Sequence, residues 1–169
     1  MVDPEIPLPA SGPEPGEHLS AFIVEDVTGK FPGEHLCYVC YLGEGPVVLV
    51  FAREIDGRLA RLASDLDGWV ERHPEARAFV AVPTDDPEGD AEALRELAAE
   101  HGVRLPLTLC AEGEFGPHLY RLHPRVPVTA LLYREKTVVR SLSARVPDEE
   151  LRAEVLREAE ALVLRTRSD

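Results

Sequence analysis

Long apolar segments are missing from this chain of 169 residues. The longest apolar run, from Pro46 to Ala52, has the length of a buried strand, whereas a helix needs ~20 apolar residues to cross a bilayer. The first residues contain neither the basic segment nor the apolar segment of a secretory signal. We therefore expect a cytoplasmic protein without a membrane partner.

Positive charge is also scarce. Lys and Arg together number 18, against 31 Asp and Glu, and the formal net charge is −13. Binding to a phosphate backbone needs clustered Lys and Arg, and no basic stripe with interleaved aromatic residues is present. The sequence also lacks a Gly-rich phosphate loop and a G-x-S-x-G nucleophile elbow. We expect no nucleic-acid partner, no nucleotide or serine-hydrolase chemistry, and no cofactor.

Cysteine is rare as well, with three residues in the whole chain. This small, odd number argues against a secreted scaffold held together by disulfides. Cys37 and Cys40 form a C-x-x-C pair, whose two intervening residues permit a small disulfide ring and a switch between dithiol and disulfide. Cys110 stands alone at the end of a predicted strand, which is typical of a small buried core residue.

The distribution of Pro, Glu and Gly divides the chain into a tail and one domain. Residues 1–17 are rich in these three residue types and have little to bury, which predicts a tail or a strap that lies over the domain. Residues 18–166 have the composition of a single globular domain.

Apolar runs alternate with amphipathic segments throughout that domain. Strands are predicted at 21–27, 46–52, 78–82, 106–111, 128–133 and 137–142. Helices are predicted after the caps Asp56 and Asp90 and from Pro147 onward. The segment Tyr41-Leu-Gly-Glu-Gly-Pro46 is predicted to be non-helical, so that no helix dipole supports the cysteine pair. This order predicts an α/β domain with a mixed central sheet and helices on both faces.

Two local sequences accompany this order of elements. Residues 22–29 read Phe-Ile-Val-Glu-Asp-Val-Thr-Gly, and residues 125–129 read Arg-Val-Pro-Val-Thr directly before an apolar strand. With these features, residues 18–166 resemble the thioredoxin-like superfamily, and most of all its peroxiredoxin-like and extracytoplasmic thioredoxin-like branches. The resemblance implies a thioredoxin-like fold with an N-terminal β-hairpin extension. It also implies a cis-proline loop at Val126 and Pro127, packed against the active-site cysteines.

The place where this superfamily carries its reactive cysteine holds other residues here. In thioredoxins the strand equivalent to 46–52 leads into a trp-cys-x-x-cys turn, and this chain has Arg53-Glu-Ile-Asp-Gly57 there. The pro-x-x-x-thr/ser-x-x-cys sequence of peroxiredoxins is absent too. The C-x-x-C pair lies upstream of the strand instead. Arg53, Glu54 and Asp56 at the strand end are typical of a strand exit followed by a capped helix, and the alternative is a site for an anion or a small substrate.

We predict thiol–disulfide exchange at Cys37 and Cys40 with a protein that carries a disulfide or a dithiol. Pro127 and Val126 would shape the groove for this partner, and the positive charge of His35 or Arg53 would favour a thiolate. The sequence does not distinguish the attacking thiol from the resolving one. The alternative is a non-catalytic thioredoxin-fold module that binds a partner protein and carries a structural or inert C-x-x-C.

Zinc is a further alternative for the same stretch. His35, Cys37 and Cys40 supply three ligand types of a tetrahedral site. The fourth ligand would have to come from His118, His123 or Cys110. Because no second C-x-x-C and no paired His follow at the spacing of a zinc finger, we predict no metal.

Overall fold

The computed structural model describes residues 7–168, with side chains as far as residue 164. In this part of the chain, seven strands form one sheet in the order β2-β1-β5-β4-β3-β6-β7. The strands are β1 (Val24–Asp26), β2 (His35–Leu36), β3 (Val47–Ala52), β4 (Arg77–Val82), β5 (Leu107–Cys110), β6 (Val128–Arg134) and β7 (Thr137–Ala144). The helices are α1 (Tyr38–Leu42), α2 (Gly57–Arg72), α3 (Pro87–His101) and α4 (Glu149–Ser168), with a 3-10 helix η1 (His118–Tyr120).

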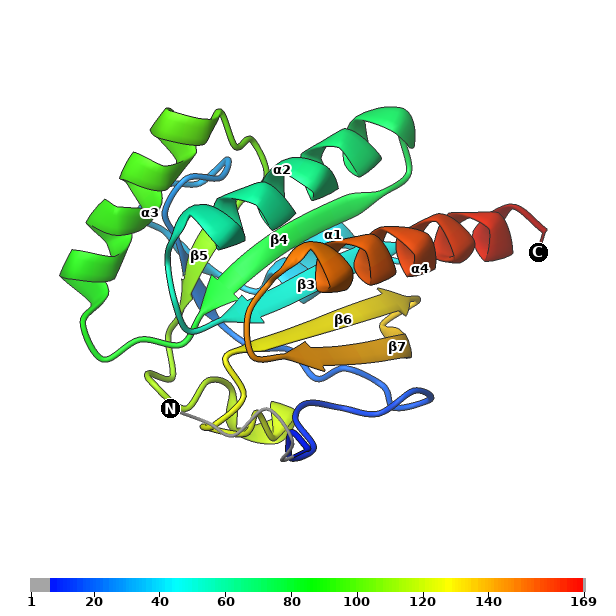
Figure 1. Ribbon diagram of the computed structural model, residues 1–169, viewed down its shortest axis with the longest axis horizontal. Coiled ribbons are helices and arrows are strands. Elements are labelled where there is room, and N and C mark those ends of the chain that lie inside the picture. The colour runs from blue at the N-terminus through cyan, green and yellow to red at the C-terminus, as the bar shows by residue number, and fades with distance from the viewer. Residues whose placement is uncertain (1–6, 169) are drawn as a thin grey trace.

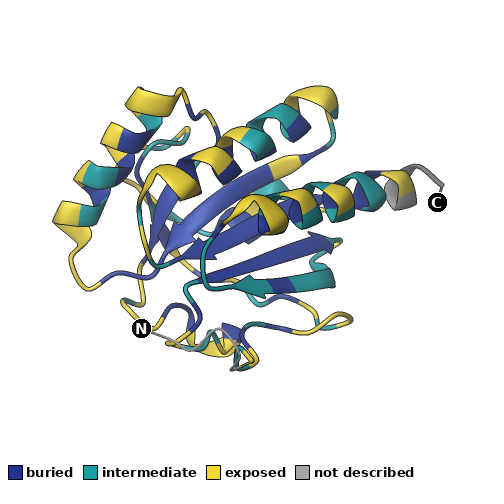
Figure 2. Ribbon diagram, viewed as in Figure 1, coloured by how far each residue is buried: buried dark blue, intermediate teal, exposed yellow. Residues whose placement is uncertain are grey.

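The centre of the sheet is parallel and its flanks are antiparallel. Strand β3 pairs parallel with β4 and antiparallel with β6, while β4 pairs parallel with β5. All six residues of β3 are buried because both faces of the sheet are covered, as Figure 2 shows. Since β3, β4 and β5 run in one direction, we call the two ends of the sheet the amino end and the carboxyl end of these strands. The mixed α/β architecture predicted from the sequence is confirmed.

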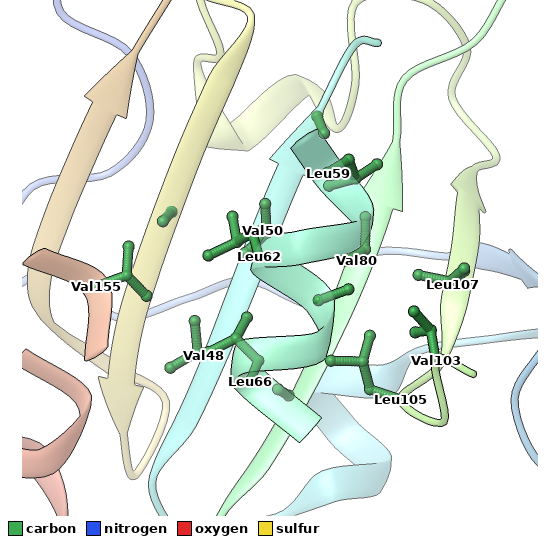
Figure 3. Packing of buried hydrophobic residues seen from close by; sticks show 14 of the residues in the cluster. Val48, Val50, Leu59, Leu62, Leu66, Val80, Val103, Leu105, Leu107 and Val155 are labelled. Carbon is green, nitrogen blue, oxygen red and sulfur yellow. The ribbon is translucent and has the colours of Figure 1, made fainter. Parts of the chain in front are cut away.

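Helices α2, α3 and α4 cover one face of the sheet (Figure 1). The apolar stripe of α2 is fully buried, and its Leu59, Leu62 and Leu66 lie over Val50 and Val80 of the central strands (Figure 3). Helical spacing places these leucines on one side of α2, so that their burial holds the helix against the sheet.

The predicted cap of α2 is confirmed, and the predicted cap of α3 is wrong. Asp56 Oδ1 accepts the backbone N–H groups of residues 58 and 59 at 3.1 Å. Helix α3 begins at Pro87 rather than after Asp90, because a proline suits the first helical turn and Asp86 Oδ1 accepts the N–H of Gly89 at 3.2 Å. Asp90 instead accepts the Thr84 hydroxyl.

The opposite face is covered by α1, η1 and the N-terminal segment, with an aromatic cluster beneath them. The Phe22 ring lies 5.6 Å from that of Phe51 and 4.8 Å from that of Tyr120. The helical cover is short here, and aromatic rings fill the space that longer helices fill on the first face.

The described part of the predicted tail lies along the edge of the sheet. Gly16 N–H donates to the Val138 carbonyl at 2.8 Å, and Val138 N–H donates to the Glu17 carbonyl at 2.9 Å. These bonds cover the outer edge of β7, which would otherwise expose unpaired backbone groups. The division of the chain at residue 17 stays a prediction, and residues 1–6 lie outside the described residues. Within the described chain, no helix combines the length and the apolar character that crossing a membrane requires.

Candidate functional site

Cys37 and Cys40 are joined by a disulfide on the surface of the domain. Their Cα atoms are 5.3 Å apart, a separation that suits this bond. Cys37 is the N-cap of α1, and its sulfur accepts the backbone N–H of Cys40 at 3.1 Å. Cys40 is exposed, whereas Cys37 is half-buried. The two sulfurs therefore differ both in access and in hydrogen bonding.

Tyr41 and Leu42 belong to a helix that begins inside the C-x-x-C pair, which corrects the sequence prediction for the first two residues of the segment 41–46. Helix α1 spans Tyr38–Leu42 and ends at Gly43, which has a positive φ of 79°. Sequence patterns pointed to a coil because Gly43, Gly45 and Pro46 follow closely. A helix of five residues is marginal by itself, and here it is held by the burial of Tyr38 and Val39 against the sheet.

Tyr38, which lies between the two cysteines, anchors α1 to the N-terminal hairpin. Its hydroxyl donates to Asp26 Oδ2 at 2.6 Å, and its ring lies 5.3 Å from that of Phe79 on β4. Asp26 is fully buried and also accepts the N–H groups of Gly29 and Phe31 at 2.8 and 2.9 Å. Burial, with the bond to Asp26, raises the pKa of Tyr38 well above its usual value. The helix that carries the cysteine pair is therefore anchored by the buried side chains of Tyr38 and Asp26.

Sequence reasoning missed this support. The only available signal was a tyrosine inside the C-x-x-C, downstream of an aspartate in the Phe-x-Val-x-Asp-x-x-Gly stretch. Nothing in that spacing shows that the two side chains meet.

His35 lies on β2, two residues before the cysteine pair. Its side chain is 60% exposed, and Nε2 lies 4.0 Å from Glu25 Oε1 on the neighbouring strand β1. The carboxyl group of Glu25 is therefore a charge partner of the imidazole, and the support of a thiolate by His35 stays a prediction.

Arg53 and Pro127 form a second group, at the carboxyl end of the sheet. The backbone N–H of Arg53 donates to the Pro127 carbonyl at 2.9 Å, and Nη1 donates to the Glu114 carbonyl at 2.5 Å. Burial lowers the pKa of Arg53, although Cys110 and Glu114 lie close enough to oppose the shift.

The end of helix α1 lies toward the amino end, because Tyr41 and Leu42 line one pocket with Arg77 and Ala78 at the start of β4. Cys37 follows Leu36, which lies opposite Val24 of β1, and Val24 lies opposite Cys110 at the end of β5. Strand β3, whose six residues span about 17 Å, runs from the amino end to the carboxyl end. The expectation that Arg53, Val126 and Pro127 surround the cysteine pair stays a prediction. The pair comes before β3 in the sequence, and the proline loop is paired with the end of β3.

The prediction of a cis-proline is wrong as well. The Val126–Pro127 peptide is trans, like every other peptide bond of the described chain. Val126 is buried and its N–H donates to the His123 carbonyl at 3.0 Å, while Val128 pairs with Ala52 as β6 begins. The loop serves as the entry to an antiparallel strand.

Cys110 is a buried free thiol at the end of β5, as the sequence indicated. It is 3% exposed, and burial raises its pKa to about 12, an effect that the nearby Arg53 opposes. A thiol in this state is a poor nucleophile at neutral pH.

The candidate zinc ligands do not come together in the described residues. No group of three or more His, Cys, Asp or Glu side chains is arranged to hold a metal in the described residues. Cys37 and Cys40 bond to each other, and Cys110 is buried on β5. His123 Nδ1 accepts the N–H of Arg125 at 3.0 Å.

Comparison with known proteins supports the fold. No protein-family model matches the chain, and no curated protein matches it in sequence. Among solved structures, it is similar to a proposed thiol:disulfide interchange protein DsbE from Chlorobium tepidum, with 15% identity, a TM-score of 0.67, and coverage of 89% of this chain and 98% of that chain. A secreted Mycobacterium tuberculosis disulfide oxidoreductase homologous to E. coli DsbE has 12% identity and a TM-score of 0.62. The match covers 84% of this chain and 96% of that chain. Peroxidoxin BcpB from Mycobacterium tuberculosis has 21% identity and a TM-score of 0.62. The match covers 89% of this chain and 96% of that chain.

These similarities define the class of protein: the chain has the thioredoxin-like fold. Its sheet, helices and N-terminal hairpin are those that the sequence resemblance implied. Within this fold it carries a C-x-x-C disulfide on the short helix before β3, and Arg53 follows β3.

Proposed function

We propose that the protein carries out thiol–disulfide exchange at Cys37 and Cys40 with a partner protein. The observation that carries the proposal is the asymmetry of the pair, in which Cys40 is exposed while the Cys37 sulfur accepts the N–H of Cys40. A hydrogen bond to a thiolate favours the charged form, so it stabilises Cys37 as a leaving or resolving group. Thiol:disulfide interchange in structural neighbours of low identity supports this chemistry.

In the reductive direction, the Cys40 thiolate attacks one sulfur of the partner's disulfide. A Cys40–partner bond forms, and the partner's second sulfur leaves as a thiolate. The Cys37 thiolate then attacks Cys40 Sγ, which forms the Cys37–Cys40 disulfide and releases the partner as a dithiol. Two electrons pass from the pair to the partner, and the oxidising direction follows the same steps in reverse. The predicted cytoplasmic location stays a prediction.

Trapping of mixed disulfides tests this assignment. In a Cys110→Ser background, reduced Cys37→Ser and Cys40→Ser variants are mixed with a disulfide-linked peptide, and adduct formation is followed by mass spectrometry. We expect the Cys37→Ser variant, which retains Cys40, to form the adduct about tenfold faster or more.

A faster reaction of the Cys40→Ser variant would assign the attack to Cys37. If neither variant reacted faster than an unstructured cysteine peptide, the proposed exchange function would be wrong. The chain would then be a thioredoxin-fold binding module with an inert disulfide.

A further inference from the structure

A pocket of about 330 Å³ opens at the amino end of the sheet, between α1 on one face and the last turns of α2 on the other. Its volume lies at the lower end of the range typical of small-molecule sites, roughly 300–1,000 Å³. Tyr38, Tyr41 and Leu42 of α1 form one wall, and Val70 of α2 lies among the residues that complete it. The site is distinct from the disulfide, because neither Cys37 nor Cys40 lines it.

The apolar lining of this pocket is held in place. Tyr38 is fixed by its bond to Asp26 and by its contact with the Phe79 ring. The Tyr41 ring packs edge-on against the Tyr38 ring, with a centroid distance of 6.1 Å and an interplanar angle of 84°. Buried Ala78 and Leu105 form part of the floor. A preformed apolar pocket of this kind suits a flat hydrocarbon group, because little side-chain freedom is lost on binding.

The acidic residues around the pocket are engaged elsewhere in the protein or with Arg104, and so do not neutralise the other two positive charges of the lining. Asp67 already accepts the backbone N–H groups of Arg104 and Leu105 at 2.7 and 2.8 Å. Glu71 pairs with the Arg104 guanidinium at 3.0 Å. The two acids on the rim are therefore engaged within the protein.

Lys30 and Arg77 differ from these acids. Neither forms an ion pair with any described residue, and both are exposed at the rim. Arg77 Nη1 donates only to the carbonyls of Pro74 and Ala76, at 2.7 Å each. Two uncompensated cations beside an apolar pocket complement a ligand that has an apolar body and a negative group.

We propose that this pocket binds a small organic anion, with a flat aromatic or branched apolar body and one carboxylate or sulfonate group. The body lies between Tyr41, Leu42 and Val70, and the anionic group lies at Lys30 and Arg77. The whole chain carries a net charge of −13, which by itself opposes the binding of an anion, so the attraction has to come from the local positive charge of Lys30 and Arg77. The proposal is independent of thiol exchange.

Fluorescence titration of the oxidised protein with 8-anilino-1-naphthalenesulfonate tests the proposal. The neutral analogue N-phenyl-1-naphthylamine, which keeps the ring system and lacks the sulfonate, is titrated beside it. Val70→Phe places a ring in the pocket and is expected to weaken both probes about tenfold or more. Lys30→Glu and Arg77→Glu are each expected to weaken the sulfonate about fivefold and to change the neutral probe by less than about twofold.

Arg61→Glu is the matched control, because Arg61 is an exposed arginine of α2 that does not line the pocket. It is expected to change sulfonate affinity by less than about twofold. Thermal melts establish that each variant is folded. The proposal is overturned if the native protein does not bind the sulfonate, or if Val70→Phe leaves its affinity unchanged. It is equally overturned if the charge reversals at Lys30 and Arg77 act no more strongly than the one at Arg61.

Discussion

The chain places its cysteines in two opposite environments. Cys37 and Cys40 sit on a short surface helix that follows the edge strand β2, and they form a disulfide. At the carboxyl end, Cys110 is buried beside Arg53, and burial raises its pKa to about 12. The sequence resemblance implied a reactive cysteine directly after β3, whereas this chain has Arg53 there and exposes Cys40 on the helix before β3. Exposure and local hydrogen bonding thus favour Cys37 and Cys40 as the exchange site, although they do not lie at the position after β3.

Removing the exposed pair is expected to have the largest effect. We expect the Cys37→Ser/Cys40→Ser double variant to lose at least about 100-fold in exchange activity, measured as dithiothreitol-coupled reduction of a disulfide peptide. The Cys110→Ser variant, as the control, is expected to keep the native rate. A loss of activity in the Cys110→Ser variant, with the native rate kept in the double variant, would assign the exchange to Cys110.

The buried support of the pair is the next target. Tyr38→Phe removes the hydroxyl that donates to Asp26 at 2.6 Å, and we expect it to lower the free energy of unfolding by about 2 kcal/mol because a buried acceptor loses a donor. Tyr41→Phe on the same helix is the matched control, since Tyr41 is exposed, and is expected to change stability by less than about 0.5 kcal/mol. Urea unfolding measures both. Equal effects would show that Asp26 does not hold α1.

The sequence was sufficient to predict the central strand and its covering helix, but not helix α1. The continuous apolar run of β3 predicted a central strand, because burial on both faces of a sheet leaves a continuous apolar run. The stripe of Leu59, Leu62 and Leu66 predicted a covering helix, because burial of one helix face leaves apolar residues at helical spacing. Helix α1 left no such pattern. It is held by contacts of Tyr38 with residues distant in the sequence.

The position of the cysteine pair relative to Pro127 was also out of reach. A loop that precedes a strand can cross either face of the sheet, and the sequence around Cys37 does not say which part of the sheet it will cover. The side chains of Asp26 and Tyr38 settle that question in the folded chain, because they tie α1 to the hairpin.

The stability of the carboxyl end should depend on pH through Cys110. Its pKa is raised in the folded state, so the native protein keeps a proton that the unfolded chain releases above about pH 8.5. This contribution is fully present below that pH and declines as the pH rises towards 12. Between pH 8 and pH 10, we expect the native chain to lose about 1–2 kcal/mol more stability than the Cys110→Ala variant. Parallel pH dependences of the two proteins would mean that Cys110 titrates as an ordinary thiol.

Arg53 should have the smallest effect. Its Nη2 atom is buried without a hydrogen-bond partner among the described residues, so replacing the guanidinium removes a desolvated charge along with the bond to Glu114. We expect Arg53→Met to change the free energy of unfolding by less than about 0.5 kcal/mol and to leave the exchange rate at the native value. A tenfold loss of exchange rate would show that Arg53 takes part in the reaction of the cysteine pair.

The central claim is that Cys37 and Cys40 exchange electrons reversibly, and a redox titration tests it most directly. The Cys110→Ser protein is equilibrated in glutathione and dithiothreitol buffers, and free thiols are counted by a mass tag. We predict one reversible two-electron transition between about −180 and −270 mV. A pair that stays oxidised below about −300 mV, or thiols that never oxidise, would contradict the claim and leave the C-x-x-C as a structural clip or an inert pair.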